Sequence, residues 1–299
     1  MTVADCAVLP DRTDLFGRSW RGRRVTVVGL GRSGQAAAEL LVQLGCRVRI
    51  TEGRDAHTLR AAQRSLEALG VEAVELGAHT RAFIEDAELI VVSPGVAESS
   101  APIQWALAKP VPIISEIELA FACCPAPIVA VTGTNGKSTV VTLIAELLRA
   151  AGRSAIACGN LGVPFSSVVD RLTPHSVAVV EVSSFQLLWC DQFRPHIGVL
   201  LNLSTNHLDR HADSQAYLAA KARLFQRQTA GDWAVLNGLD PQIVALSQRL
   251  QAQCVWFGDN QSNPPGLTVA EETRRSLTES AQAVLQVGRL LGIPDPLTW

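Results

Sequence analysis

The sequence predicts an α/β protein made of parallel sheets, and three observations indicate this class. Short β-branched runs such as "RRVTVVGL" and "IVAVTG" end in glycine, and each precedes a stretch of helical composition. Apolar strand-like runs alternate with amphipathic stretches, which is the rhythm of βαβ units. The length of 299 residues suits about two domains. We therefore expect open parallel sheets with helices on both faces.

The first domain is expected over residues 1–124, as a Rossmann-like parallel sheet. Its strands are predicted in "RRVTVVGL", "CRVRIT", "VEAVEL" and "AELIVVSPG". Helices are predicted in "SGQAAAELLVQLG", which Gly45 would end, and from about Thr58 to Leu69. The stretch "CCPAP" at 123–127 interrupts this series with two prolines, as a linker does.

The second domain is expected over residues 125–299, as a phosphate-loop ATPase type of α/β fold. Its strands are predicted in "IVAVTG", "SAIAC", "SVAVVEV", "IGVLLNL", "DWAVLN" and "CVWFG". A helix that Gly152 ends should bury one apolar face, formed by Val140, Leu143, Ile144, Leu147 and Leu148. Further helices are predicted near 214–228, 241–252 and 276–291.

Composition excludes several classes of protein. The formal net charge of −2 disfavours a wholesale nucleic-acid or anionic-membrane binder. The first twenty residues mix charges with apolar residues, unlike a signal peptide, and no apolar run approaches the ~20 residues of a membrane helix. The seven cysteines show no CxxC or zinc spacing, so we expect reduced thiols in a cytoplasmic protein.

A first glycine motif, "GLGRSG", places Gly29, Gly31 and Gly34 between a predicted strand and a predicted helix. Glycines permit a tight turn, and the N-terminus of a helix presents free N–H groups to an anion. Glu52 ends the next strand, where an acid could bind a ribose. The motif alone fits a dinucleotide, another nucleotide, or a purely structural turn.

A second glycine motif, "TGTNGKST", departs from the common phosphate loop. That loop would need its first glycine at Val131, and here the glycine comes two residues later, at Gly133. Gly133 and Gly136 still permit the positive backbone angles of an anion nest. Lys137 could then bind phosphates and Ser138 could bind Mg²⁺. The alternative is an ordinary helix cap.

Polar residues follow the predicted strands of the second domain. Glu181 ends "SVAVVEV", where it could bind Mg²⁺ or form a solvated strand end. Ser183, Ser184 and Gln186 come next and could bond a substrate.

Three more positions are candidates of differing strength. His207 follows "IGVLLNL" and lies beside Asn206 and Asp209, although His211 is an alternative ligand. Asn160 lies in the glycine-rich "CGNLGVP". Lys221, in "YLAAKARLF", is by itself typical of a solvated helix face.

Five segments, in this order, resemble the Mur ligases: "TGTNGKST", "GNLG", "EVSSFQL", "NHLD" and "YLAAKARLF". These are ATP-dependent amide-bond-forming enzymes of peptidoglycan synthesis. The N-terminal "GLGRSG" and "VVSPGV" resemble the branch that adds D-glutamate to UDP-N-acetylmuramoyl-L-alanine. The resemblance runs from about residue 22 to about residue 258.

The resemblance implies roles for individual residues. ATP would be bound by Gly133, Thr134, Asn135, Gly136, Lys137, Ser138 and Thr139. The UDP-sugar would be contacted by Ser33, Glu52, Arg54, Ser93, Pro94, Gly95, Asn160, Ser183 and His207. Mg²⁺ would be held by Ser138, Glu181, His207 and by Lys221 as a carbamate. Lys137, Lys221 and His207 would then be the catalytic residues of a monomeric cytoplasmic enzyme.

The sequence also departs from the family pattern. Mur ligases have a third domain that holds the incoming amino acid, and the chain stops at "GRLLGIPDPLTW", so we expect that domain to be missing. The family's His-Asn-x-x-Asn segment, which touches adenine, is not found either. A ligase therefore competes with a UDP-sugar- and ATP-binding remnant. A nicotinamide-dependent oxidoreductase would leave "TGTNGKST" without a role.

Overall fold

The computed structural model describes residues 13–203, 213–258 and 278–293. The chain divides into two compact units. The first comprises Met1–Cys124 together with Val163–Asp170 and Trp189–Gln192. The second comprises Pro125–Gly162, Arg171–Leu188 and Phe193–Trp299. Two short segments from the later part of the chain therefore pack with the first unit.

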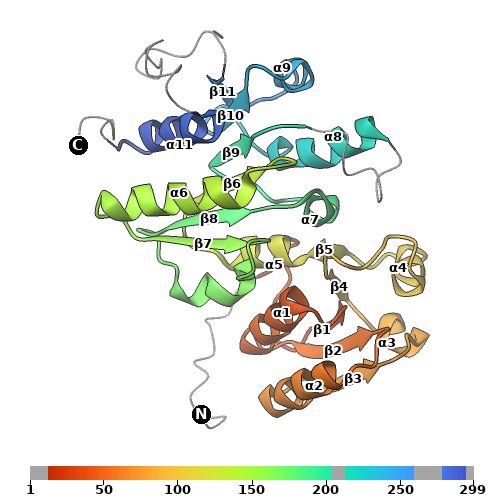
Figure 1. Ribbon diagram of the computed structural model, residues 1–299. Coiled ribbons are helices and arrows are strands. Elements are labelled where there is room, and N and C mark those ends of the chain that lie inside the picture. Colours follow the sequence, from red (N-terminus) through yellow and green to blue (C-terminus); the bar gives the residue numbers. More distant parts are fainter. Residues whose placement is uncertain (1–12, 204–212, 259–277, 294–299) are drawn as a thin grey trace. The chain divides into compact units, whose positions relative to one another are not determined.

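The first unit holds a five-stranded parallel sheet in the order β3-β2-β1-β4-β5 (Figure 1). Its strands are β1 (Arg24–Val28), β2 (Arg47–Glu52), β3 (Ala73–Leu76), β4 (Leu89–Val92) and β5 (Ile113–Ser115). Its helices are α1 (Arg32–Gln43), α2 (His57–Leu69), α3 (Arg81–Glu85), α4 (Ala101–Leu107) and α5 (Glu116–Cys123). Helix α1 packs against α2 and α5, and α3 packs against α4. The order reverses direction between β1 and β4, so the carboxyl ends of these strands flank the switch point of the sheet.

Two buried acids at the start of α5 hold the later segments of the first unit. The Glu116 carboxylate accepts a hydrogen bond of 2.6 Å from the backbone N–H of Ser166. Glu118 accepts bonds from the N–H groups of Asp191 and Gln192, at 3.1 and 2.6 Å. Burial raises the pKa of Glu116 against the opposing effect of its bonds to Ser166. These carboxylates explain why the two segments belong to the first unit.

The second unit holds a six-stranded parallel sheet in the order β11-β10-β9-β6-β8-β7. Its strands are β6 (Ile128–Thr132), β7 (Ala155–Gly159), β8 (Val177–Glu181), β9 (Ile197–Leu200), β10 (Trp233–Asn237) and β11 (Gln253–Phe257). Its helices are α6 (Lys137–Ala150), α7 (Ser184–Leu188), α8 (Ser214–Ala222), η4 (Arg223–Phe225), α9 (Pro241–Ser247) and α11 (Glu279–Leu290). The 3₁₀ helix η2 (Phe165–Arg171) lies mostly in the first unit.

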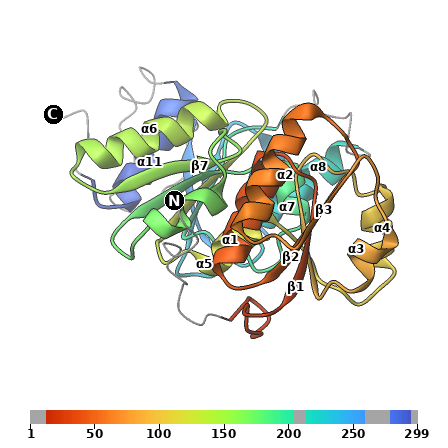
Figure 2. The ribbon, with the colours of Figure 1, turned by 90° about the horizontal axis from the view of Figure 1, so that it is seen from below.

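Helices α6 and α11 lie side by side on one face of this sheet (Figures 1 and 2). Val140, Ile144 and Leu148 of α6 are buried as predicted, and they share the core with Val287 of α11. The prediction was wrong for Leu143, which is 42% exposed. Its place on the apolar face is taken by Val141 and Ala145, since the buried stripe is centred one residue away from the predicted one.

Two of the predicted helices are shorter in the structure. The helix expected over 214–228 ends as α8 at Ala222 and continues as the 3₁₀ turn η4. The helix expected over 241–252 ends at Ser247. Among the described residues, none of the helices combines the length and apolar character needed to cross a bilayer.

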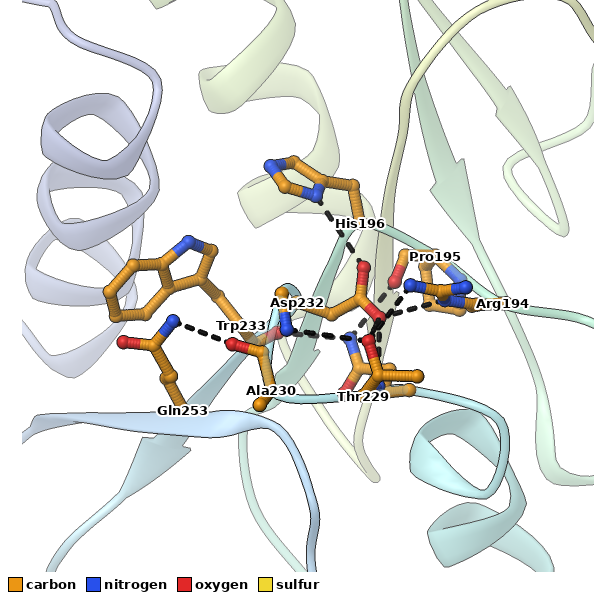
Figure 3. A network of polar contacts seen from close by, with 10 residues as sticks. Arg194, Pro195, His196, Thr229, Ala230, Asp232, Trp233 and Gln253 are labelled. Carbon is orange, nitrogen blue, oxygen red and sulfur yellow. Dashed lines mark hydrogen bonds and ion pairs between the residues drawn. The ribbon is translucent and has the colours of Figure 1, made fainter.

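A polar network closes the amino edge of the second sheet (Figure 3). The buried carboxylate of Asp232 accepts bonds from Arg194 Nε at 2.8 Å and from the Thr229 N–H at 2.8 Å. The ring of His196 lies 3.6 Å from its other oxygen. The side chain of Gln253 donates to Ala230 O at 2.8 Å. This network links the segments that lead into β9, β10 and β11. It lies at the amino ends of these strands, opposite the carboxyl ends.

Candidate functional site

The loop "TGTNGKST" lies at the carboxyl end of β6, between β8 and β9 of the sheet. The chain reaches β8 through β7 on one side of β6 and then crosses to β9 on the other side. This reversal makes β6 the switch point of the second sheet, where the loops on either side diverge and leave room for a ligand. The loops after β6, β8 and β9 therefore meet at one edge.

Both glycines of the loop adopt backbone angles that other residues avoid. Gly133 has a φ of +154° and Gly136 has a φ of +81°. A Cβ atom on Gly133 would also lie 2.9 Å from Cβ of Leu201. Gly136 is the residue before α6, so the loop turns directly into the helix N-terminus.

Lys137 folds back over the loop. Its Nζ donates to the carbonyl oxygens of Gly133 and Thr134, at 3.0 and 2.9 Å. Burial lowers the pKa of Lys137, and the carboxylate of Glu181 opposes this shift. The ammonium is thus held at the loop, where it could bind a phosphate group in place of the carbonyls.

Glu181 joins the loops after β6 and β7. It is 2% exposed, which rules out the solvated strand end that its position also allowed. One carboxylate oxygen accepts the hydroxyl of Ser138 at 2.6 Å, and the other accepts the amide of Asn160 at 2.8 Å. The structure therefore brings together three of the predicted residues as one cluster of oxygen and amide groups.

Lys221 reaches the same loop from α8, and its side chain is almost fully buried. It is 1% exposed, so the solvated helix face that a lone lysine suggests is wrong. Its Nζ donates to Gly133 O at 2.9 Å and lies 4.4 Å from the ring centre of Tyr217. Burial, reinforced by the charge of Lys137, lowers the pKa of Lys221 to about 7. Burial therefore favours the neutral form of this amine.

Sequence reasoning missed two residues that touch the loop. Tyr217, the single tyrosine of the chain, is buried one turn before Lys221, and its hydroxyl lies 3.2 Å from Oγ1 of Thr134. The i, i+4 spacing from Lys221 could have indicated it. Asn202 follows β9, and its side chain bonds the backbone of Thr134 and Asn135. Its place directly after a buried strand was the available signal.

Ser183 turns toward its own segment. Its N–H and hydroxyl both bond Oε1 of Gln186, each at 2.9 Å. Gln186 is buried, so it fixes the turn between β8 and α7. Ser183 therefore lies near the carboxyl end of β8. Its contact with a substrate stays a prediction.

In the first unit, the glycines of "GLGRSG" serve different purposes. Gly29 has a φ of +96°, and a Cβ atom there would lie 2.9 Å from Cβ of Ser93. A Cβ atom on Gly34 would lie 2.0 Å from the carbonyl oxygen of Gly29. Gly31 has an ordinary φ of −73° and open space around its Cβ position. The fold thus requires Gly29 and Gly34, whereas Gly31 leaves room for a ligand.

Glu52 holds the same loop from β2. Its carboxylate accepts the N–H of Leu30 at 3.0 Å and the guanidinium of Arg54 at 2.9 and 3.1 Å. These bonds from Arg54, helped by the Leu30 N–H, lower the pKa of Glu52 to about 2 against the effect of burial. The Arg54 side chain is 70% exposed, so it is the partner that a ligand could reach.

The other predicted contacts of the first unit lie around these loops. Ser93, at the end of β4, donates to Gly29 O at 3.0 Å. Pro94 and Gly95 continue the turn after it, and Ser33 lies half-buried in the first turn of α1. Ser93 therefore ties the ends of β1 and β4 together at the switch point of the first sheet.

One predicted residue lies outside the described residues. This is His207, together with its neighbours Asn206 and Asp209 and the alternative His211. Within the described ranges, no group of three or more His, Cys, Asp or Glu side chains could by itself hold a metal ion. A Mg²⁺ ion bound by one or two protein oxygens, phosphates and water does not need such a group.

Comparison with known proteins decides the family. The Mur ligase middle domain matches residues 131–289, and the MurD-like N-terminal domain of Mur ligases matches residues 23–115. The chain belongs to the Mur ligase family. The two matches include both glycine loops, "TGTNGKST" and "GLGRSG". Both loops therefore belong to Mur ligase domains and not to a nicotinamide-dependent oxidoreductase.

Among related proteins, the UDP-N-acetylmuramoylalanine–D-glutamate ligase of Desulfosudis oleivorans is 41% identical over 83% of this Mur ligase chain. The match covers 54% of that protein, so the chain spans about half the length of the curated relatives it matches.

Solved structures show the same fold. UDP-N-acetylmuramate:L-alanyl-gamma-D-glutamyl-meso-diaminopimelate ligase from Neisseria meningitides superimposes with a TM-score of 0.59 at 20% identity, covering 92% of this chain and 95% of that one. MurF ligase from Thermotoga maritima, solved with ADP, gives 0.52 at 17% identity, covering 93% and 65%. The Mur ligase middle domain binds ATP, and members of the family are ATP-dependent amide ligases.

Proposed function

We propose that this chain binds UDP-N-acetylmuramoyl-L-alanine and ATP and joins D-glutamate to the sugar-nucleotide, as a cytoplasmic enzyme of peptidoglycan synthesis. The observation that carries the proposal is the meeting of Lys137, Ser138, Glu181 and Lys221 around one glycine loop at the switch point of the second sheet. The identity to D-glutamate ligases supports the choice of substrates.

The proposed reaction activates a carboxylate. The carboxylate of UDP-N-acetylmuramoyl-L-alanine attacks the γ-phosphorus of ATP, which forms an acyl phosphate and releases ADP. The amine of D-glutamate then attacks the acyl carbon, the amide bond forms, and inorganic phosphate leaves. Both reactants of the first step are anions, so the site must neutralise charge and align them.

The residues of the second unit fit this task. The N–H groups at the start of α6, within the loop over residues 133–139, and the ammonium of Lys137 would receive the phosphates of ATP. Asn160 and Ser183 would orient the sugar-nucleotide.

The donor atoms present also fit Mg²⁺. The Ser138 hydroxyl and the Glu181 carboxylate lie 2.6 Å apart and offer the hard oxygen ligands that this ion prefers. His207 is proposed as a further ligand. When bound, Mg²⁺ would neutralise charge on the phosphate oxygens.

Lys221 is proposed to act as a carbamate. Its neutral amine would add to CO₂, forming an N–C bond and releasing one proton. Burial favours this chemistry because it lowers the pKa of Lys221 to about 7. The product is an anion, which would make Lys221 a metal ligand rather than a cation.

The test of the two-site arrangement is Lys137→Ala. We expect ATP affinity to fall about tenfold or more, since a bond from a charged donor is lost. Affinity for UDP-N-acetylmuramoyl-L-alanine should stay near that of the wild type, because the proposed uridine contacts lie in the first unit. Isothermal titration with each ligand measures both values.

The matched control is Lys109→Ala, an exposed lysine after α4 whose ammonium donates to the Glu85 carbonyl at 3.3 Å. It should change neither affinity. Equal loss of both ligands in Lys137→Ala would contradict the division into two sites. Tight NADH binding without any response to the UDP-sugar would contradict the proposal for the first unit.

A second candidate function is a binding module without turnover. The observation that favours it is that the glycine loops of both units are formed, each with its own polar contacts. Such a module would bind the UDP-sugar and ATP through the same residues and release no phosphate.

A further inference from the structure

We infer that Asn202 is a positioning residue that selects which N–H groups of the glycine loop face the phosphates of ATP. The inference rests on the proposed ATP site and assigns a role to a residue outside the predicted set. Asn202 lies two residues after the end of β9, next to the loop that follows β6.

The side chain of Asn202 makes three bonds with the loop backbone. Its Oδ1 accepts the N–H groups of Thr134 and Asn135, at 3.1 and 2.9 Å. Its Nδ2 donates to Asn135 O at 3.2 Å. The backbone carbonyl of Asn202 also accepts the Thr134 N–H, at 3.0 Å. The amide thus binds both the N–H and the carbonyl of Asn135, which belong to successive peptides of the loop.

These bonds divide the loop into two parts. The N–H groups of Thr134 and Asn135 are occupied by Asn202. The N–H groups at the start of α6 have no partners inside the helix, because the first turn of any α-helix leaves them free. Phosphate oxygens are therefore directed to residues 136–139, beside Lys137 and the Ser138–Glu181 pair.

The chemistry of a carboxamide suits this position. The contact needs one group that accepts two N–H bonds and donates one to a carbonyl. A carboxylate could accept both bonds but would face the Asn135 carbonyl without a proton and would repel the phosphates. A shorter side chain could not reach both the N–H and the carbonyl of Asn135. Tyr217 and Lys221 hold the loop from α8, so Asn202 supplies the support from the β9 side.

The test compares ATP with AMP, because the ratio of their affinities isolates binding through the β- and γ-phosphates. In Asn202→Ala we expect the preference for ATP over AMP to fall about tenfold, with AMP affinity little changed. The matched control is Asn237→Ala, at the end of the adjacent β10. That amide is 3% exposed and donates to Leu201 O and Glu279, both at 2.9 Å. It should cost stability while the preference for ATP stays that of the wild type.

The isosteric variant Asn202→Asp covers the case in which the alanine variant fails to fold. We expect it to lose the preference for ATP at least as far, because it adds a negative charge beside the phosphates. A wild-type preference in either folded Asn202 variant would overturn the inference and leave the proposed function standing. A wild-type chain that binds no ATP would overturn the proposed function, and the inference with it.

Discussion

Lys221 shows how far the environment of a single residue departs from what its neighbours in the sequence suggest. In "YLAAKARLF" it looks like a lysine on a solvated helix face, and the structure buries it against Tyr217 and Gly133. Burying an ammonium costs free energy, which lowers the pKa and favours the neutral amine. Only the resemblance to Mur ligases predicted a special role for this residue.

Carbamylation of Lys221 can be measured directly. After exposure to ¹³C-labelled bicarbonate, we expect the wild type to show a carbamate carbon signal by NMR, because its buried amine is a nucleophile near neutral pH. Lys221→Ala should lack the signal, and Lys109→Ala should retain it, since Lys109 is exposed. A signal of equal strength in Lys221→Ala would refute the assignment.

At the residue scale, the sequence predicted which residues form the proposed ATP site better than it predicted their contacts. Lys137, Ser138, Asn160 and Glu181 are indicated by motifs, and the structure places them together. Asn202 and Tyr217 could not be ranked from sequence, since an asparagine after a strand and a tyrosine on a helix are common. Their contacts depend on β9 and α8 lying beside the loop.

The glycine loop that joins β1 to α1 yields a prediction that distinguishes effects on folding stability from effects on ligand binding. Gly34→Ala should destabilise the first unit by about 3 kcal/mol, because its Cβ would lie 2.0 Å from a backbone oxygen. Gly31→Ala should leave stability within about 0.5 kcal/mol, because its Cβ position is open, yet weaken UDP-sugar binding. Thermal unfolding by circular dichroism and titration calorimetry measure the two effects.

The control for this pair is ATP affinity, which should be unchanged in Gly31→Ala because the second unit is intact. Unaltered UDP-sugar affinity in Gly31→Ala would mean that the motif serves only as a structural turn. The sequence alone is also consistent with such a structural turn.

The amino edge of the second sheet yields a prediction about pH (Figure 3). Burial would raise the pKa of Asp232, but the bonds from Arg194 and Thr229 outweigh it and lower the pKa below its usual 3.8. The folded carboxylate therefore stabilises the protein above the unfolded pKa, and this stabilisation is lost as the pH falls through the lower folded pKa. Asp232→Asn should lose about 1 kcal/mol at pH 7, since Arg194 is partly exposed.

The measurement is the melting temperature of Asp232→Asn against the wild type between pH 7 and pH 3. We expect a deficit of about 2–4 °C at pH 7 that shrinks toward pH 3. Asp191→Asn is a comparison variant outside this network. A deficit independent of pH would show that the charge of Asp232 does not supply the stabilisation.

At the scale of the whole molecule, the decisive question is turnover. With UDP-N-acetylmuramoyl-L-alanine, ATP and Mg²⁺ present, we expect phosphate release that depends on D-glutamate, because the loop, Glu181 and Lys221 are in place in the described structure. Lys137→Ala, assayed in parallel, should lower the rate on the order of 10²-fold. Intact binding of both nucleotides without phosphate release would favour the binding module.

The sequence by itself determined the class of fold and the positions of its loops. Apolar runs with β-branched residues predict buried parallel strands, and glycines after them place both glycine loops at carboxyl edges, because these signals are local. Only the tertiary structure decided which side chains converge. It buried Lys221, brought Asn202 to the peptide of Asn135, and used Glu116 and Glu118 to retain two later segments in the first unit. Each of these contacts joins residues far apart in the chain, so it depends on the order of strands in the sheets, which no local pattern encodes.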